Sequence, residues 1–387
     1  MTKKLLMIVN VDWFFLSHRL PIALGAIEAG YEVHIATGIT NCLQEMQSYG
    51  LRVHPIILTR GDTSVAKTLI LGAQILKLLS TLKPDILHLV TIKPVLIGGI
   101  LARLCRTPSV VSAISGLGFT FTDKSTKANL IKRLVSYLYQ QAFGHKNLQV
   151  IVQNSNDLVT LQKITKLPEQ RFTLLPGSGI DLKKFYPQPY PTGKPIVMLA
   201  SRMLMSKGVQ EFVEAARYLS QEKEVDARFV LVGSPDPYNP TSLTEEQLIH
   251  WQQESIIEWW GHRTDMAATI NEAHIIVLPS SYGEGLPKVL IEAAACGRPI
   301  VTTNIPGCRD AIEANVTGFL VPVKDVDALA AAMESLILDP QQRASMGQAG
   351  RQRAEAYFAI EDIVAAHLRI YSEMYRSANL TTQAPKL

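Results

Sequence analysis

The sequence has few cysteines, and none of them stands in a metal-binding or disulfide pattern. Its four cysteines, Cys42, Cys105, Cys296 and Cys308, are far apart and form no C-x-x-C pair. Small secreted domains and zinc sites space their cysteines much more closely. We therefore expect reduced, mostly buried thiols in a cytosolic protein.

The sequence also lacks an uninterrupted apolar run of membrane-spanning length. The apolar ranges 68–79 and 95–105 contain Lys77 and Arg103 and are shorter than the ~18 residues that a span requires. The opening stretch MTKKLLMIVNVDWFF imitates a signal peptide, but Asn10 and Asp12 interrupt its apolar run and no small-residue cleavage site follows. We expect a first buried strand here and no segment that crosses a bilayer.

No stretch is low in complexity, and no internal repeat indicates a solenoid. The chain has 387 residues, 47% of them hydrophobic, which is enough for two domains with separate cores. Its net charge of +4 is unevenly distributed: residues 1–185 carry 21 Lys and Arg against 10 Asp and Glu, and the remainder carries 17 against 24. A first half at +11 indicates an anionic partner, which could be a nucleic acid, a phospholipid surface or a diphosphate-linked substrate.

Short β-rich apolar runs alternate with helical patterns along the whole chain, which predicts an α/β protein. The predicted strands of the first series are 5–9, 32–36, 86–89, 109–111 and 149–152, and those of the second are 196–200, 228–232, 275–279 and 299–302. Four prolines between 187 and 195 disfavour regular structure and separate the two series. We predict two doubly wound, Rossmann-like domains, 1–185 and 186–360, that face a cleft, with a C-terminal helix and tail at 361–387 crossing back to the first.

The stretch SSYGEGLPKVLIEAAACGRPIV at 280–301 places two carboxylates near the end of a predicted strand. Glu284 lies in the turn after that strand, and Glu292 lies on a helix predicted over 286–295, with Pro287 in its first turn. The N–H groups around Gly285 and Leu286 would form a phosphate site at the start of this helix. Spacing alone favours a simpler interpretation, in which Glu284 is a solvated loop acid and Glu292 is a helix-surface acid.

A second stretch, LASRMLMSKGVQEF, follows the first strand of the second domain and places Arg202 and Lys207 across a turn. A guanidinium and an ammonium at the carboxyl end of a strand could neutralise a diphosphate. An ordinary solvated helix start is the alternative. Together with the predicted helix start near Gly285, the two cations indicate a single anionic ligand.

These stretches, with PGSGID at 176–181 and WGHRTDM at 260–266, resemble the retaining glycosyltransferases of family 4, which have the GT-B fold. The resemblance implies a nucleotide-sugar-binding second domain, in which Arg202 and Lys207 hold the donor diphosphate and Glu284 contacts the donor sugar. It further implies that Glu292 binds the ribose, that Gly285 and Leu286 give N–H groups to the sugar or phosphate, and that Arg263 lies beside the base. It also implies a UDP-sugar donor and catalysis without a metal ion or other cofactor.

The first domain departs from the family pattern, since its first loop lacks a glycine pair and SAISGLGFTF lacks a histidine. Our candidates for acceptor contacts are residues of these two segments: His18, Arg19, Ser115, Gly116 and Gly118. For His18 and Arg19, an ordinary helix start is the alternative. The segments SHRLPIA and SGLGF are similar to those of bacterial transferases that extend sugars on undecaprenyl diphosphate. This similarity implies a lipid-linked saccharide acceptor in surface-polysaccharide (O-antigen or capsule) assembly. The pair of aspartates in DVD at 325–327 is interpreted as a helix cap rather than a metal motif.

A predicted helix over 124–141 gives the basic half a candidate role at a membrane. Its apolar stripe comprises Leu130, Ile131, Leu134, Val135 and Leu138, and its other face comprises Lys132, Arg133, Ser136 and Gln140. Such a helix could dock on the anionic cytoplasmic face of the inner membrane, or it could pack its stripe on the sheet.

Three functions remain open at this point. The first is sugar transfer from a nucleotide donor to a lipid-linked acceptor, which we favour. The second is non-hydrolysing epimerisation of a sugar nucleotide, which can use the same fold. The third is non-catalytic binding of a polyanion, but no interleaved basic and aromatic surface or nucleic-acid motif supports a nucleic-acid partner.

Overall fold

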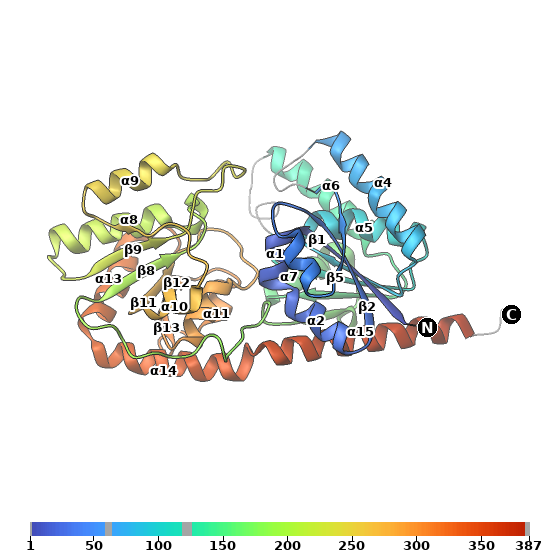
Figure 1. Ribbon diagram of the computed structural model, residues 1–387. Coiled ribbons are helices and arrows are strands. Elements are labelled where there is room, and N and C mark those ends of the chain that lie inside the picture. The colour runs from blue at the N-terminus through green and yellow to red at the C-terminus, as the bar shows by residue number, and fades with distance from the viewer. Residues whose placement is uncertain (1, 59–63, 118–125, 384–387) are drawn as a thin grey trace. The chain divides into compact units, whose positions relative to one another are not determined.

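The computed structural model describes residues 2–58, 64–117 and 126–383 (Figure 1). The chain folds into two compact units. Unit 1 comprises Met1–Ser178 and Glu361–Leu387, and unit 2 comprises Gly179–Ile360. The chain therefore passes from the first unit to the second before the proline-rich stretch and returns after Ile360.

Unit 1 is built on a parallel sheet of seven strands in the order β3-β2-β1-β4-β5-β6-β7. The strands are β1 (Lys3–Val11), β2 (Tyr31–Gly38), β3 (Arg52–Pro55), β4 (Ile86–Val90), β5 (Ser109–Ile114), β6 (Leu148–Val152) and β7 (Phe172–Leu174). Every residue of β4 and β5 is buried, as expected for strands covered on both faces. The opening apolar run is thus a central strand.

Helices cover both faces of this sheet. One face packs against α4 (Val65–Leu82), α5 (Ile92–Leu104), α6 (Thr126–Ala142) and α7 (Ser155–Thr165). The other packs against α1 (Asp12–His18), α2 (Leu20–Glu28), α3 (Leu43–Ser48) and α15 (Ile360–Gln383). The last helix of the chain contributes Ile370, Tyr371 and Met374 to the core of unit 1.

The apolar stripe predicted on α6 is divided by its packing. Val135 and Leu138 pack against the core of unit 1, whereas Ile131 and Leu134 are exposed. The side chain of Leu130 lies outside the described residues. The helix turns Tyr139 and Ala142 inward as well, so its buried face is rotated from the predicted one.

Unit 2 repeats the architecture with six parallel strands in the order β10-β9-β8-β11-β12-β13. They are β8 (Ile196–Ala200), β9 (Arg228–Val232), β10 (Glu258–Trp259), β11 (Ile275–Leu278), β12 (Ile300–Thr303) and β13 (Gly318–Val321). The predicted fold class of two doubly wound α/β domains is confirmed.

The helices of unit 2 also lie on both faces of its sheet. One core contains residues of α10 (Met266–Asn271), α11 (Lys288–Ala295) and α12 (Cys308–Ala311). The other contains residues of α8 (Val209–Arg217), α9 (Glu245–Gln253) and α13 (Val326–Leu338), and α14 (Pro340–Tyr357) contributes to both. The Asp325 side chain accepts a hydrogen bond of 2.9 Å from the N–H of Ala328 at the start of α13, which confirms the cap interpretation.

Candidate functional site

The carboxyl edge of the unit 2 sheet gathers most of the predicted site residues. Arg202 follows β8, and Glu284 follows β11, the strand next to it in the sheet. Parallel strands end at the same edge, which is where ligands of such sheets bind. Residues 82 positions apart in the sequence are therefore brought to neighbouring loops.

The loops after β8 and β11 are joined by an ion pair between Lys207 and Glu284. The Glu284 carboxylate is also 2.8 Å from the Ser280 hydroxyl. The two charged side chains are only 12% and 11% exposed. Burial by itself lowers the pKa of Lys207, but the neighbouring carboxylate outweighs it and raises that pKa above its ordinary value. Lys207 is thus held as a cation in a largely water-excluded place.

Gly208 lets these two loops approach closely. It has a φ of 76°, and a Cβ there would lie 2.2 Å from the carbonyl oxygen of Pro279. Only glycine tolerates both conditions without displacing a backbone. The residue after Lys207 therefore fixes the distance between the cation and the β11 loop.

Arg202 is paired with an acid that sequence reasoning missed. Its Nη1 donates a hydrogen bond of 2.6 Å to Oδ2 of Asp236, in the loop after β9. Asp236 could have been found because it follows a predicted strand, as Arg202 does. Each cation of the predicted diphosphate clamp is therefore matched by a carboxylate, and an anionic ligand would share or replace these contacts.

Glu292 is not the surface acid that its spacing also allowed. Its residue is 7% exposed, and its Oε1 lies 3.8 Å from the Lys288 ammonium one turn earlier on α11. Burial raises the pKa of this carboxyl group, although Lys288 and Lys184 oppose the shift. A buried carboxylate with such a long ion pair is suited to accept hydrogen bonds from a ligand hydroxyl.

The helix after Glu284 begins later than predicted. Gly285 and Leu286 are buried in the loop, Pro287 is the N-cap with extended backbone, and α11 starts at Lys288. A proline restricts the residue before it to extended conformations, so Leu286 does not enter the helix. The predicted range 286–295 is wrong at its start.

Arg263 lies in a separate loop, after β10. Its guanidinium carbon is 5.4 Å from the ring centroid of Trp260, and its side chain is exposed. The backbone N–H of Trp260 donates a hydrogen bond of 2.9 Å to the Leu231 carbonyl of β9, which anchors the start of this loop. The exposed guanidinium thus lies over a partly buried tryptophan ring near the carboxyl edge, as a cation–π pair.

In unit 1, the structure brings Arg19 and Ser115 together. Arg19 is 2% exposed, and its Nη2 donates a hydrogen bond of 3.3 Å to the Ser115 hydroxyl, just after β5. Burial lowers the pKa of Arg19 to about 10. The guanidinium therefore lies within the unit and positions the β5 loop.

The other acceptor candidates are less closely grouped. His18 stacks on Phe14, with ring centroids 4.2 Å apart. Gly116 has a φ of 101°, a conformation that favours glycine. Gly118 lies outside the described residues.

Asp12 is a further buried acid at this edge, which sequence reasoning treated only as an interruption. Its carboxylate accepts hydrogen bonds from the N–H groups of Trp13, Thr40, Asn41 and Cys42 and from the Thr40 hydroxyl, at 2.7–3.2 Å. These bonds outweigh burial, which acts in the opposite direction, and lower the pKa of Asp12. Asp12 therefore fixes the loop after β2 against the loop after β1.

Within the part of the chain that the structure describes, no three His, Cys, Asp or Glu side chains gather as a metal site. The loops after β8, β9 and β11 carry two cation–carboxylate pairs, and the buried Glu292 lies on the helix that follows β11. Such a set can bind an anion and stabilise charge that develops on a leaving group.

Family comparisons agree with this division of the chain. Residues 183–353 match the model of "Glycosyl transferases group 1", and residues 4–154 match that of "Glycosyl transferase 4-like".

Among characterised relatives, a Campylobacter jejuni protein is 28% identical over 94% of this chain and 99% of its own length. It is named N,N'-diacetylbacillosaminyl-diphospho-undecaprenol alpha-1,3-N-acetylgalactosaminyltransferase. An Escherichia coli relative, UDP-Gal:alpha-D-GlcNAc-diphosphoundecaprenol alpha-1,3-galactosyltransferase, is 26% identical over 66% of this chain and 67% of its own.

Solved structures confirm the GT-B fold. A glycosyltransferase from Rickettsia africae has a TM-score of 0.76 at 18% identity and covers 96% of this chain and 98% of its own. Anabaena HepE in complex with UDP has a TM-score of 0.75 at 16% identity and covers 96% and 100%.

Proposed function

We propose that this chain transfers a hexose or N-acetylhexosamine from a UDP-sugar to a lipid-diphosphate-linked saccharide. The chain is a glycosyltransferase of group 1, and its first half is glycosyl transferase 4-like. The Campylobacter and Escherichia relatives are named for acceptors that are sugars linked to diphospho-undecaprenol, and these names support a lipid-diphosphate-linked acceptor here. The product would be an intermediate of a bacterial surface polysaccharide. The Lys207–Glu284 pair beside Arg202 is the observation that carries the chemistry.

The reaction breaks the bond between the sugar's anomeric carbon and the diphosphate, so negative charge grows on the departing UDP. Lys207 and Arg202 would stabilise that charge from the carboxyl edge of unit 2, and buried cations do so more strongly than solvated ones. Glu284 would contact the sugar beside Lys207, and Glu292 would accept hydrogen bonds from the ribose hydroxyls.

The proposal includes retention of the anomeric configuration and no metal ion. Retention is checked by NMR of the product, whose new linkage would have the anomeric configuration of the donor. Independence of metal is checked by activity after exhaustive treatment with EDTA. A requirement for added Mg²⁺ or Mn²⁺ would overturn that part of the proposal.

We propose further that unit 1 docks on the anionic cytoplasmic face of the inner membrane, through α4 together with α6. By length and composition α4 could span a bilayer, yet Leu71, Ile75 and Leu79 pack it into the core of unit 1. Its opposite side exposes Val65 at 74% and Leu69 at 70%. An apolar surface that a folded unit leaves to water is typical of an interaction site.

The second docking helix lies on the same face of the sheet, because α4 and α6 both pack against α5 (Figure 1). Among the described side chains of α6, Ile131, Leu134 and Tyr137 are exposed apolar residues, and Lys132 and Arg133 lie between them in the sequence. Apolar side chains flanked by cations fit an anionic lipid surface.

Vesicle flotation tests the docking surface. Binding should rise with the phosphatidylglycerol content and fall as salt approaches ~0.5 M. The variants Val65→Glu/Leu69→Glu and Lys132→Glu/Arg133→Glu should each float less, whereas Leu338→Glu, an equally exposed leucine of unit 2, should float like the wild type. Equal flotation of all four proteins would overturn the docking proposal and leave the transferase reaction untouched.

A further inference from the structure

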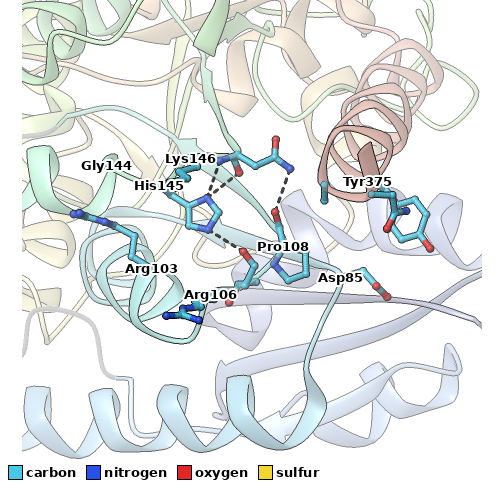
Figure 2. A pocket seen from close by; sticks show the side chains of 12 residues that line it. Asp85, Arg103, Arg106, Pro108, Gly144, His145, Lys146 and Tyr375 are labelled. Atoms are coloured by element: carbon cyan, nitrogen blue, oxygen red, sulfur yellow. Dashed lines mark hydrogen bonds between the residues drawn. The ribbon is translucent and has the colours of Figure 1, made fainter. Parts of the chain in front are cut away.

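A pocket lies at the edge of the unit 1 sheet where the strands begin, opposite the edge that carries the acceptor candidates (Figure 2). Asp85, Pro108 and Asn147 directly precede β4, β5 and β6 and line this cavity of about 690 Å³. Tyr375 and Asn379 of α15 form another part of its wall. Its size falls within the usual range for small-molecule sites.

The pocket is separate from the acceptor candidates. Ser115 follows the carboxyl end of β5, whereas Pro108 precedes its amino end. The strand has six residues, which places the two edges roughly 16 Å apart at the usual rise per residue. A small ligand in this pocket would not reach the residues assigned to the acceptor.

Three cations line the pocket: Arg103, Arg106 and Lys146. No ion pair joins any of them to a carboxylate in the described parts of the chain. Asp85 is the one acid among the lining residues, and its Oδ2 accepts a hydrogen bond of 2.7 Å from the Lys4 N–H. Figure 2 shows Arg103 and Arg106 on one side of Pro108 and Asp85 and Tyr375 on the other.

Hydrogen bonds link several of the residues that line the pocket. The His145 Nε2 lies 2.9 Å from the Thr107 carbonyl, and its Nδ1 lies 3.0 Å from the Asn147 carbonyl. The Asn147 amide nitrogen lies within 3.1 Å of the Pro108 carbonyl, the Ser109 hydroxyl and the Met374 carbonyl of α15. The protein's own hydrogen bonds therefore hold the turns that carry Arg106 and Lys146, which reduces the entropic cost of binding.

Arg103 is held in the same way at the edge of the pocket. Its Nη1 donates a hydrogen bond of 2.6 Å to the Gln141 carbonyl in the last turn of α6. A Cβ on Gly144 would lie 2.8 Å from that nitrogen. The guanidinium thus keeps its remaining N–H groups available to a second acceptor.

We propose that this pocket binds a phosphate-bearing small molecule, with its phosphate groups at Arg103, Arg106 and Lys146. Guanidinium groups bind phosphate through paired hydrogen bonds, and the ammonium adds a point charge. The rest of the ligand would lie against Pro108 and Tyr375, with a hydroxyl group toward Asp85. The site is independent of sugar transfer and is suited to a regulatory ligand.

Isothermal titration with inorganic pyrophosphate tests the site, in full-length protein whose donor clamp is removed by Arg202→Ala/Lys207→Ala. We expect one pyrophosphate to bind per chain, and we expect its affinity to fall about tenfold or more when Arg106→Glu/Lys146→Glu is added. The matched pair Lys163→Glu/Lys166→Glu, exposed at the end of α7, should bind as before. Thermal unfolding of each variant checks that these surface changes leave the fold intact.

Flotation with phosphatidylglycerol vesicles distinguishes a free phosphate compound from a lipid headgroup. If Arg106→Glu/Lys146→Glu lowers vesicle binding while Lys163→Glu/Lys166→Glu does not, the phosphate belongs to a lipid; if it lowers only pyrophosphate binding, the ligand is a soluble compound. If the two double variants lose binding equally, or if Arg106→Glu/Lys146→Glu loses binding in neither assay, the proposed phosphate site would be overturned.

Discussion

The Lys207 ammonium and the Glu284 carboxylate are 77 residues apart in the chain and form an ion pair at the carboxyl edge of the unit 2 sheet. The pair joins the loop after β8 to the loop after β11. Because both side chains are largely buried, their charges interact more strongly than a surface pair does. In the proposed reaction this pair would hold a cation ready for the charge that grows on the departing diphosphate.

Removing either cation of the clamp should slow sugar transfer severely. We expect Lys207→Ala and Arg202→Ala to lower kcat by about 100-fold or more, the scale of losing one transition-state charge stabiliser. Arg217→Ala is the matched control, because that arginine makes a half-exposed ion pair with Glu254 away from the clamp. Steady-state kinetics with saturating acceptor measure the effect, and near-normal turnover in both clamp variants would contradict the assignment.

Replacing Glu292 should weaken donor binding more than turnover. The ribose changes little during bond cleavage, so a contact to it stabilises the ground state and the transition state alike. Glu292→Gln and Glu292→Ala should both raise the Kd for UDP measured by calorimetry, while kcat at saturating donor changes less. The exposed Glu245→Gln serves as the control. If UDP binds all three variants as it binds the wild type, Glu292 has no part in the donor site.

The stability of unit 1 should depend on pH through His367. Burial lowers the pKa of this histidine from 6.5 to about 4, with nearby Arg19 adding to the shift. Between these two pH values the unfolded chain binds a proton that the folded chain does not, so acidification favours unfolding. Urea denaturation from pH 7.5 to 5 should show falling stability, and His367→Gln should reduce the slope. An unchanged slope in the variant would refute the role of His367.

Asp12 should stabilise the loops at the acceptor edge of unit 1. It is fully buried, and Asp12→Ala leaves four backbone N–H groups without their acceptor. A hydrogen bond to a charged group contributes about 1.5–3 kcal/mol, so the free energy of unfolding should fall by about that amount in urea denaturation. Glu45→Gln, exposed on nearby α3, should change little. A loss no larger than the control's would show that water replaces the Asp12 contacts.

The long buried strands could be predicted from the sequence because they are continuous apolar runs. The other strands lack that signal: β3 contains Arg52 and Pro55, β7 has three residues, β10 has two, and β13 begins with Gly318. The contact face of α6 also could not be predicted. Neighbouring α5 and α7 decide which side of that helix is buried, and its own periodicity does not.

The cations of the site were predictable, but their partners were not. Arg202 and Lys207 follow a recognisable strand, and the turn after another strand identifies Glu284. Whether a carboxylate touches an ammonium depends on loop geometry, and here it depends on the close approach at Gly208. Asp236 also follows a predicted strand, but its pairing with Arg202 depends on how the two loops fold.

Transfer of labelled sugar to a lipid tests the central claim most directly. The wild-type protein and Lys207→Ala are incubated with each common UDP-hexose and UDP-N-acetylhexosamine, with and without extracted undecaprenyl-diphosphate-linked saccharides. We predict that one donor labels the lipid fraction and that labelling and UDP release both require the acceptor. The Lys207→Ala variant should lose nearly all of this labelling. Epimerised sugar nucleotide formed without acceptor, or binding of donors with no transfer to any lipid-linked saccharide, would contradict the proposed function.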